Sequence, residues 1–252
     1  MSTSLPIALI TGAARGIGFG IAEEMCAAGW HVVINDINQD AAAKAAAHLR
    51  DAGHQASHHA ADVSNEQANE HMLDAIEAAH GPVTALVNNA GICPFVDVME
   101  IDRATFSRTL EINLVAPFLL SQAAAKRMIA HKLAGRIVFI TSLSEDFTNA
   151  SQGDYAASKA GLRMLMKAFA LALGPHGITC NAVAPGHVLT EMTRHHWEQA
   201  EPAAYIKTRV PLARLGQPRD IGRSVVYLAA ASTEYVSGIT LTTDGGFSAA
   251  NN

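Results

Sequence analysis

Tyr155 and Lys159 stand four residues apart within Asp154–Leu173, a stretch with helical periodicity. Side chains at this spacing lie on one face of a helix. A lysine ammonium beside a phenol stabilises the phenolate and lowers the tyrosine pKa from its usual value of about 10. A tyrosine of this kind can exchange a proton with an alcohol or a carbonyl. The spacing alone is common, and an ordinary contact on a helix surface is the competing interpretation.

A hydroxyl is expected close to this pair. Ser142 precedes Tyr155 by thirteen residues and follows the expected strand Arg136–Thr141, so it falls where a parallel sheet meets its ligand. Ser144 is a second candidate hydroxyl, eleven residues before Tyr155. The next two residues, Glu145 and Asp146, would disfavour an anionic or purely hydrocarbon substrate and could hydrogen-bond the hydroxyls of a sugar or polyol. A solvated loop tip is the alternative for these two carboxylates.

A glycine-rich turn follows the first expected strand and opens a helix. Its sequence is Thr-Gly-Ala-Ala-Arg-Gly-Ile-Gly, from Thr11 to Gly18. Glycines let a backbone approach a pyrophosphate, and a helix N-terminus offers N–H donors and the positive end of its dipole. The spacing G-x-x-x-G-x-G differs from the usual G-x-G-x-x-G, so the turn alone indicates a dinucleotide site only moderately.

Asp36 ends the second expected strand, eighteen residues after Gly18. A carboxylate there can accept hydrogen bonds from both ribose hydroxyls of the adenosine half, and it would repel a 2′-phosphate. A turn-forming aspartate is the competing interpretation. Arg15 could hold a 2′-phosphate instead, but the residue after Asp36 is Ile37 and no second basic residue follows. The sequence therefore favours NAD over NADP.

The elements that must position these groups alternate between short apolar runs and longer helical patterns. This alternation predicts an α/β fold, a Rossmann-type, doubly wound parallel sheet of about seven strands with helices on both faces. The expected strands are Ile7–Ile10, His31–Asn35, Gln55–Ala60, Ala85–Val87, Arg136–Thr141, Thr179–Ala184 and Thr240–Thr242. The expected helices are Gly18–Ala28, Asp40–Ala52, Glu66–Ala79, Phe106–Ala130, Asp154–Leu173 and Asp220–Ala231.

No linker or repeat interrupts this rhythm, so residues 1–252 are expected to form a single domain. Residues 187–210 break the pattern after a late strand, and we expect them to form a substrate-binding lid rather than an ordinary surface helix pair. His187, directly after Pro185-Gly186, is expected near the substrate.

Composition excludes several classes of protein. The chain has 252 residues, a formal net charge of −5 and 49% hydrophobic residues, which argues against disorder and against a nucleic-acid footprint. Neither a membrane span nor a signal peptide is recognisable, so a cytoplasmic protein is expected. The three cysteines and twelve histidines show no metal-ligand spacing, and no metal is expected.

Together these residues resemble the short-chain dehydrogenase/reductase family, over essentially the whole chain. The matching pieces, in order, are Thr11–Gly18, Asp62-Val63, Asn88-Asn89-Ala90-Gly91, Asn113, Ser142, Tyr155 with Lys159, Pro185-Gly186, Pro211–Gly216 and Asp244-Gly245-Gly246. Each piece is weak alone, whereas their order and spacing are specific. One departure follows Ser142: the family often has small residues and glycine there, and this chain has Leu-Ser-Glu-Asp.

The resemblance implies a role for each matching residue. Tyr155 would be the general acid/base, and Lys159 would lower its pKa and bind the nicotinamide ribose. Ser142 would stabilise charge on the substrate oxygen, and Asn113 would hold a relay water that connects Lys159 to solvent. Asp62 and Val63 would contact the adenine, and Thr190 the carboxamide. The full cofactor set comprises Gly12, Arg15, Gly16, Ile17, Gly18, Asp36, Asp62, Val63, Asn89, Ala90, Gly91, Tyr155, Lys159, Pro185, Gly186, Val188 and Thr190.

The substrate is less well defined than the chemistry. Gly91–Phe95, which includes Cys93, and Val188–Met192 are similar to sugar-oxidising members of the family. The favoured function is therefore an NAD-dependent dehydrogenase of a sugar or polyol, with Ser142, Ser144, Glu145, Tyr155, His187 and Cys93 as its substrate-binding residues. An NADPH-dependent 3-oxoacyl-(acyl-carrier-protein) reductase is one alternative, against which Asp36 counts. A catalytically idle nucleotide-sensing protein is another, against which the intact catalytic set counts.

Two expected helices, Phe106–Ala130 and Asp154–Leu173, carry apolar residues around their circumference and therefore need a second burial partner. The candidates are Phe118, Leu119, Met164, Met166 and Phe169. Because the family pairs these helices between subunits, we expect a homotetramer with dihedral symmetry.

Overall fold

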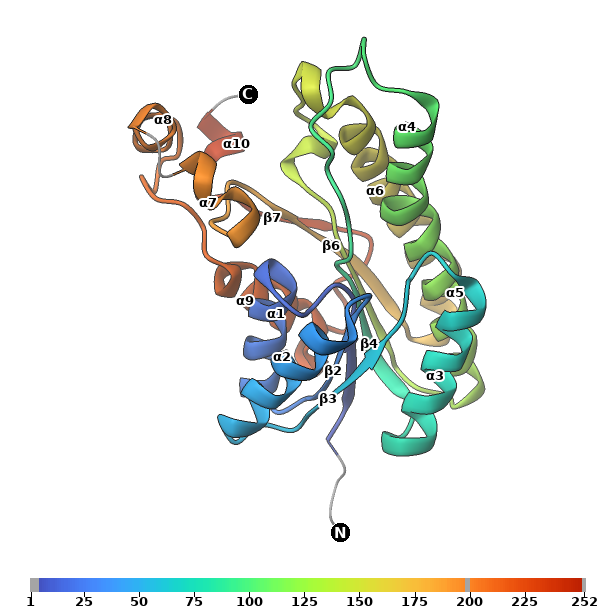
Figure 1. The fold of residues 1–252 in the computed structure, drawn as a ribbon. Helices are drawn as coiled ribbons and strands as arrows, with labels where there is room; N and C mark the ends of the chain where they lie inside the picture. Colours follow the sequence, from blue (N-terminus) through green and yellow to red (C-terminus); the bar gives the residue numbers. More distant parts are fainter. Residues whose placement is uncertain (1–4, 198–199, 251–252) are drawn as a thin grey trace.

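The computed structural model describes residues 5–197 and 200–250. Its seven strands form one parallel sheet in the order β3-β2-β1-β4-β5-β6-β7 (Figure 1). The strands are β1 (Ile7–Ile10), β2 (His31–Asp36), β3 (Ala56–Ala60), β4 (Val83–Asn88), β5 (Arg136–Ile140), β6 (Thr179–Pro185) and β7 (Thr240–Thr243). This arrangement confirms the predicted doubly wound α/β fold. Residues 198 and 199 of the expected lid, and the first four residues of the chain, lie outside the described part.

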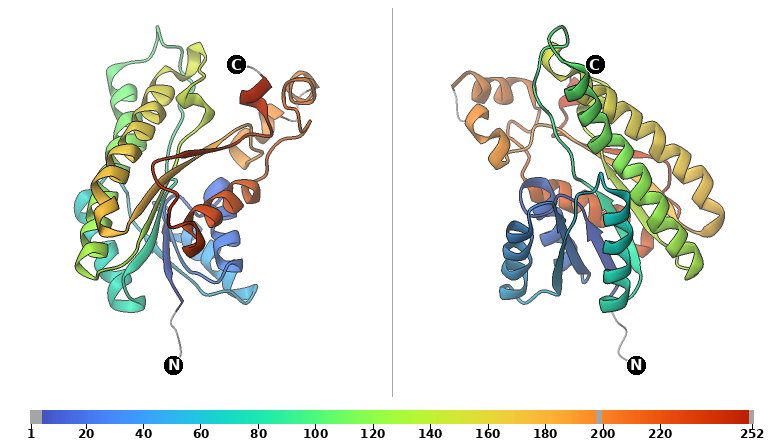
Figure 2. Two further views of the ribbon diagram at one scale, coloured as in Figure 1. Left: turned by 180° about the vertical axis from the view of Figure 1, so that it is seen from behind. Right: turned by 45° about the vertical axis from the view of Figure 1, so that its right-hand side comes forward.

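Helices cover both faces of the sheet (Figures 1 and 2). One layer consists of α1 (Gly16–Ala27), α2 (Gln39–Asp51) and α9 (Pro218–Ala229); the other contains α3 (Glu66–His80), α5 (Ala116–Ala130) and α6 (Gly153–Leu173). Strand side chains alternate between the two cores, so Ala8 and Ile10 pack in the first layer and Ile7 and Leu9 in the second. Both sets are buried, which explains why β1 is apolar throughout.

The expected lid contains two short helices, α7 (Glu191–Trp197) and α8 (Ala200–Arg209). They stand beside the C-terminal helix α10 (Phe247–Ala250), beyond the carboxyl ends of β6 and β7 (Figure 1). Their position is compatible with the predicted lid, since ligands of such sheets bind at this edge.

The expected helix Phe106–Ala130 is wrong as a continuous element. The structure has α4 (Arg103–Leu110), a π-helical turn (Glu111–Val115) and then α5. Pro117 lies in the first turn of α5 and has no N–H to donate to the carbonyl of Asn113, so a regular α-helix cannot run through this point. Single π-turns inside helices occur frequently at functional sites, and this one holds Asn113.

Candidate active site

Tyr155 and Lys159 occupy the first two turns of α6, as predicted. The Nζ atom of Lys159 is 5.5 Å from the centre of the Tyr155 ring. The same Nζ donates a hydrogen bond of 2.9 Å to the carbonyl oxygen of Ile140, the last residue of β5. The lysine is therefore buried and fixed between the helix that carries the phenol and the strand that leads to Ser142.

The predicted lowering of the Tyr155 pKa is not found. Burial raises the pKa of Tyr155 to about 12, and a hydrogen bond from the Ser142 hydroxyl opposes this shift without cancelling it. Burial likewise lowers the pKa of Lys159 to about 8. The physical reason is the loss of hydration, which disfavours the charged form of both groups. The prediction considered only the attraction between ammonium and phenolate.

Ser142 is the second residue after β5 and the N-cap of a short 3₁₀ turn, Leu143–Glu145. Its hydroxyl oxygen accepts a hydrogen bond of 3.1 Å from the backbone N–H of Ser144, which fixes the Ser142 rotamer. Ser144 is half-buried next to it. The side chain of Glu145 is only 4% exposed and pairs with Arg163, so the alternative of a solvated loop tip is wrong for Glu145. Asp146 is 59% exposed, in agreement with that alternative.

Asn113 ties the π-turn to the loop after β4. Its Oδ1 accepts from the N–H of Ile92 at 2.8 Å, and its Nδ2 donates to the carbonyl of Ile92 at 2.9 Å. A third bond of 3.1 Å runs from Nδ2 to the hydroxyl of Ser158 on α6. A Cβ on Gly91 would lie 3.2 Å from Asn113 Oδ1 and 3.5 Å from Lys159 Nζ. The lack of a side chain on Gly91 therefore lets the backbone approach Asn113 and Lys159 closely.

The structure brings Cys93 to this group. The Sγ atom of Cys93 lies 3.6 Å from Nε2 of Gln152, and Cys93 interacts electrostatically with both Tyr155 and Lys159. Burial raises the pKa of its thiol.

His187 packs in an aromatic cluster under α7 and α8: its ring lies 5.1 Å from Trp197, 5.8 Å from Tyr205 and 4.8 Å from Phe247. Leu143, the residue after Ser142, packs against the hydrophobic group that contains Phe247, so this cluster borders the Ser142 turn.

The glycine turn has the geometry of a phosphate cradle. Gly12 and Gly16 have φ values of +59° and +58°, which favour glycine. A Cβ on Gly18 would lie 2.4 Å from the carbonyl oxygen of Gly12, whereas one on Gly16 would make only an ordinary van der Waals contact with Thr190, at 3.8 Å. The turn therefore packs closely against its own backbone on one side and faces the start of α7 on the other.

Backbone and side-chain hydrogen bonds join this turn to the loop after β4. The hydroxyl oxygen of Thr11 accepts from the N–H groups of Asn89 and Ala90, each at 3.0 Å. The Asn89 amide donates in return to the carbonyls of Thr11 and Gly12, at 2.9 and 3.0 Å. These hydrogen bonds join the glycine turn and the loop after β4 into one rim at the carboxyl ends of β1 and β4, the edge at which ligands of such sheets bind.

The carboxylates expected at the adenosine end lie at strand ends. Asp36 accepts from the N–H of Ala14 at 3.3 Å and of Asn38 at 3.1 Å, which holds its carboxylate beside the glycine turn. Arg15 is exposed at the N-cap of α1. Asp62 follows β3 and accepts from Ser64 N–H and Oγ, and this hydroxyl bond is the main reason its pKa is lowered. Val63 next to it is buried.

Residues after β6 complete the opposite rim. A Cβ on Gly186 would lie 2.6 Å from Cα of Asp244, so glycine is needed where the chain leaves Pro185. Val188 forms a parallel bridge with Gly216. The N–H of Thr190 donates to the hydroxyl of Thr193 at 3.0 Å, which fixes the first turn of α7 opposite the glycine turn.

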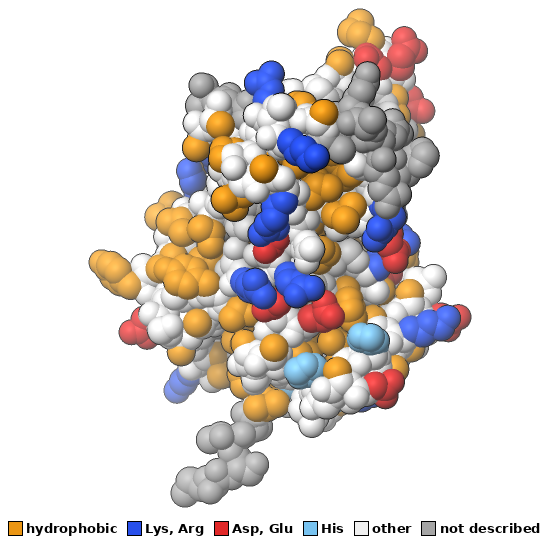
Figure 3. Space-filling model, turned by 90° about the vertical axis from the view of Figure 1, so that its left-hand side faces the viewer, with side chains coloured by type: hydrophobic (Ala, Val, Ile, Leu, Met, Phe, Trp, Pro, Cys, Tyr) orange, Lys and Arg blue, Asp and Glu red, His pale blue; other side chains and the backbone are white. Residues whose placement is uncertain are grey.

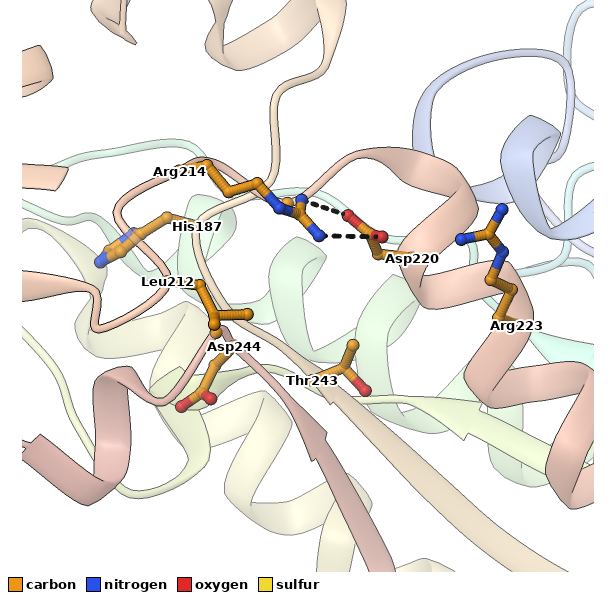
Figure 4. A pocket seen from close by; sticks show the side chains of 9 residues that line it. His187, Leu212, Arg214, Asp220, Arg223, Thr243 and Asp244 are labelled. Carbon is orange, nitrogen blue, oxygen red and sulfur yellow. Dashed lines mark hydrogen bonds and ion pairs between the residues drawn. The ribbon is translucent and has the colours of Figure 1, made fainter. Parts of the chain in front are cut away.

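A cavity of about 190 Å³ lies beside this rim, at the carboxyl ends of β6 and β7. It is lined by His187, Leu212, Arg214, Gly216, Asp220, Arg223, Thr243, Asp244 and Gly245 (Figure 4). Arg214 and Asp220 face each other across it in a two-point ion pair, at 2.7 and 3.3 Å. Of the predicted substrate-binding residues, His187 is the one that lines this cavity.

Three residues near the site were missed by the sequence analysis. The Thr109 hydroxyl donates 2.6 Å to the carboxylate of Asp154, a residue that is 1% exposed and directly precedes Tyr155. Arg163 follows Lys159 by four residues and pairs with the carboxylates of the Ser142 turn. The helical spacing of Arg163 from Lys159 could have identified it. The Thr109–Asp154 contact joins two helices and left no signal in the sequence.

Within residues 5–197 and 200–250, no helix is both long and apolar enough to cross a membrane. No group of three or more His, Cys, Asp and Glu residues in that part of the chain is arranged to hold a metal ion.

Comparison with known proteins supports the family resemblance. A family model described as enoyl-(acyl carrier protein) reductase matches residues 12–248. The chain is 38% identical to the L-rhamnose 1-dehydrogenase (NAD(P)(+)) of Azotobacter vinelandii over 94% of both chains. It is 37% identical to a 3-oxoacyl-(acyl-carrier-protein) reductase of Vibrio cholerae, over 95% of this chain and 96% of the relative.

The solved structures agree with the sequence matches. The gluconate 5-dehydrogenase of Burkholderia cenocepacia, in complex with NADP and tartrate, superimposes with a TM-score of 0.93 at 34% identity, covering 98% of this chain and 97% of the other. The sheet, the glycine turn and the Ser-Tyr-Lys group thus occur in one chain that matches such proteins almost end to end. The chain belongs to the short-chain dehydrogenase/reductase family, whose members are oxidoreductases acting on CH–OH groups.

Proposed function

We propose that this protein is an NAD-dependent oxidoreductase that interconverts a hydroxyl and a carbonyl on a small polar substrate, with a sugar or sugar-derived polyol or acid favoured. The observation that carries the proposal is the convergence of Ser142, Tyr155 and Lys159 at the carboxyl end of β5, beside a rigid glycine rim that ends at Asp36. General acid–base chemistry and nucleotide binding are thereby combined at one edge of the sheet.

The chain's own residues carry the proton. In the oxidative direction Tyr155 accepts the hydroxyl proton at its phenolate oxygen, and in the reductive direction it returns a proton to the carbonyl oxygen. Ser142 donates a hydrogen bond to the same substrate oxygen and stabilises the charge that develops there. Lys159 supplies positive charge beside the phenol. A nicotinamide, when bound, supplies or accepts the hydride.

The residues present fit such a cofactor. Gly12 and Gly18 let the glycine turn pack closely on Ala90 and on its own backbone, which places the turn at the N-terminus of α1. A pyrophosphate would bind there, because the free N–H groups of a helix N-terminus favour negative charge. Asn89, Ala90 and Gly91 would border the middle of the cofactor, and Thr190 its carboxamide. The Asn113 carbonyl receives no N–H from Pro117, which supports the relay water assigned to this residue.

The proposed preference for NAD rests on Asp36. Replacing Asp36 by alanine removes the repulsion of a 2′-phosphate and one partner of the ribose hydroxyls. We expect the ratio of kcat/KM for NAD to that for NADP to fall by about tenfold or more, equivalent to about 1.4 kcal/mol. Steady-state kinetics with both cofactors measures this ratio. An unchanged ratio would show that Asp36 does not set the preference.

The proposed substrate class is supported by two relatives, whose names specify L-rhamnose and gluconate. The test is NADH formation with a panel of aldoses, polyols, sugar acids, steroids and an acetoacetyl thioester. We expect turnover with members of the first three groups and none with steroids. Absence of NADH above the blank for every sugar, polyol and sugar acid would refute the proposal.

A 3-oxoacyl-(acyl-carrier-protein) reductase is the second candidate, because one relative of similar identity carries that name. Two features count against it: Asp36 disfavours NADPH, and the net charge of −5 disfavours docking of an acidic carrier. Faster turnover of the thioester with NADPH than of any sugar with NAD would reverse this order.

We also propose that residues 187–210 act as a substrate lid and that the chain forms a cytoplasmic homotetramer. Apolar side chains on α4–α6 support the assembly: Phe106 and Phe118 are partly exposed, and Met164 and Leu171 are 61% and 82% exposed. Met166, by contrast, is buried in the chain's own core. On the opposite side, hydrophobic side chains gather at one flank of the face that carries α9 (Figure 3), and Tyr227 of that helix is half-exposed. A monomeric mass in light scattering would refute the tetramer.

A further inference from the structure

A buried carboxylate lies in the short turn that follows Ser142. Glu145 is the third residue after Ser142, and its side chain is 4% exposed. Its Oε1 atom is 3.5 Å from Nη1 of Arg163. Its Oε2 atom is buried and accepts no hydrogen bond from the part of the chain that the structure describes. A buried carboxylate oxygen without a donor costs free energy, so its retention calls for an explanation.

The charged groups around Glu145 come mainly from one stripe of α6. Tyr155, Lys159 and Arg163 follow one another at intervals of four residues, so they share a helix face. Lys159 is close enough to interact electrostatically with Glu145, and its Nζ is bonded to Ile140, just before the Ser142 turn. The remaining neighbour on the turn is Asp146, which is 59% exposed and lies 2.6 Å from Nη1 of Arg163.

We propose that Glu145 is a positioning residue for Lys159: its carboxylate supplies the counter-charge that keeps the buried lysine protonated, and through Arg163 it holds the Ser142 turn against α6. The proposal rests on the proposed function in that Tyr155 and Lys159 are taken as the proton-transfer pair. Glu145 then acts on the lysine rather than on the substrate, in keeping with its burial. The feature replaces the small residues that the family often has after the catalytic serine.

The direction of the effect follows from the charges that face these groups. Burial lowers the pKa of Lys159 to about 8, while Cys93 on the loop after β4 and Glu145 both raise it. Burial raises the pKa of Glu145 itself, the Thr141 hydroxyl and Arg163 lower it, and Asp146 raises it. Neutralising Glu145 therefore moves the pKa of Lys159 further down, and the ammonium is lost at a lower pH than in the wild type.

The test is the pH profile of Glu145→Gln in the reductive direction, in which Tyr155 must be protonated and the alkaline limb reports Lys159. We expect the alkaline fall of kcat to begin at a pH about one unit lower than in the wild type. The two profiles should converge at acidic pH, where the wild-type carboxylate also takes up a proton. Glu145→Asp, which keeps the charge, should restore most of the alkaline limb.

Asp146→Asn is the matched control, because Asp146 pairs with the same arginine but is exposed. A second readout needs no substrate: an NMR titration of the Lys159 side chain, assigned by its absence in Lys159→Arg, should show Lys159 losing its proton at lower pH in Glu145→Gln. This readout remains valid if the proposed substrate class is wrong. An even loss of kcat at all pH values, an equal limb shift in Asp146→Asn, or an unmoved Lys159 titration would overturn the proposal.

Discussion

Replacing Tyr155 by phenylalanine should lower kcat by about a thousandfold, the scale expected when a positioned acid/base group is lost. The substitution removes one oxygen atom and keeps the ring, whose centre is 5.5 Å from the Lys159 ammonium. The lysine remains bonded to Ile140, and the glycine rim is untouched. NADH affinity should therefore remain almost unchanged while the chemical step fails.

The measurements are kcat on the best substrate of the panel and NADH binding by fluorescence titration. Tyr235→Phe is the matched control, because Tyr235 is fully exposed and can lose its hydroxyl without consequence. Retained turnover in Tyr155→Phe would show that the proton travels by another path. Absence of activity in both the wild type and the variant, with NADH still bound, would favour the idle nucleotide-sensing alternative.

Replacing Gly18 by alanine should disrupt the cofactor rim. The added Cβ would lie 2.4 Å from the Gly12 carbonyl oxygen, 2.6 Å from the Asn89 amide nitrogen and 2.8 Å from Cα of Ala13. Two of these neighbours are backbone atoms of the turn, and the third holds the turn to the loop after β4, so none can move without breaking the rim. We expect a loss of about 1–3 kcal/mol in the free energy of unfolding, as for other overpacked sites.

NADH affinity should fall by about tenfold or more in Gly18→Ala, because the distorted rim no longer fits the cofactor; tenfold corresponds to about 1.4 kcal/mol of binding free energy. Urea unfolding and NADH titration measure the two effects separately. Gly174→Ala is the control: Gly174 has φ −52° and nothing within 4 Å of an added Cβ, so NADH affinity should not change and the free energy of unfolding should not fall. Wild-type NADH affinity in Gly18→Ala would show that this turn does not carry the cofactor.

The order of elements was predictable because burial on both faces makes the strands apolar and short. The strand Ile7–Ile10 was predicted with its observed bounds, whereas Ala85–Val87 extends to Val83–Asn88. The long helix was predicted without its interruption, although Pro117 carried that information. Hydrophobic periodicity reports burial, and a proline's missing N–H changes hydrogen bonding without disturbing the periodicity.

In the candidate site, too, local features were predictable and tertiary contacts were not. The placement of Tyr155, Lys159 and Ser142 was predictable because helical spacing and strand ends are local properties of the chain. The spacing of Glu145 from Ser142 could not show whether its carboxylate meets solvent or Arg163, since that depends on how the turn packs on α6. His187 likewise follows β6 as expected, but its aromatic neighbours come from α7, α8 and α10.

The sequence by itself determined the fold class, the helical placement of Tyr155 and Lys159 on one face, and the acidic residue at the end of β2, because each depends on residue type and near-neighbour spacing. Only the tertiary structure decided the ionisation of the site. Attraction between Tyr155 and Lys159 is visible in the sequence, but the cost of removing both groups from water is not. That cost dominates here, raising the pKa of the phenol to about 12 and lowering that of the lysine to about 8.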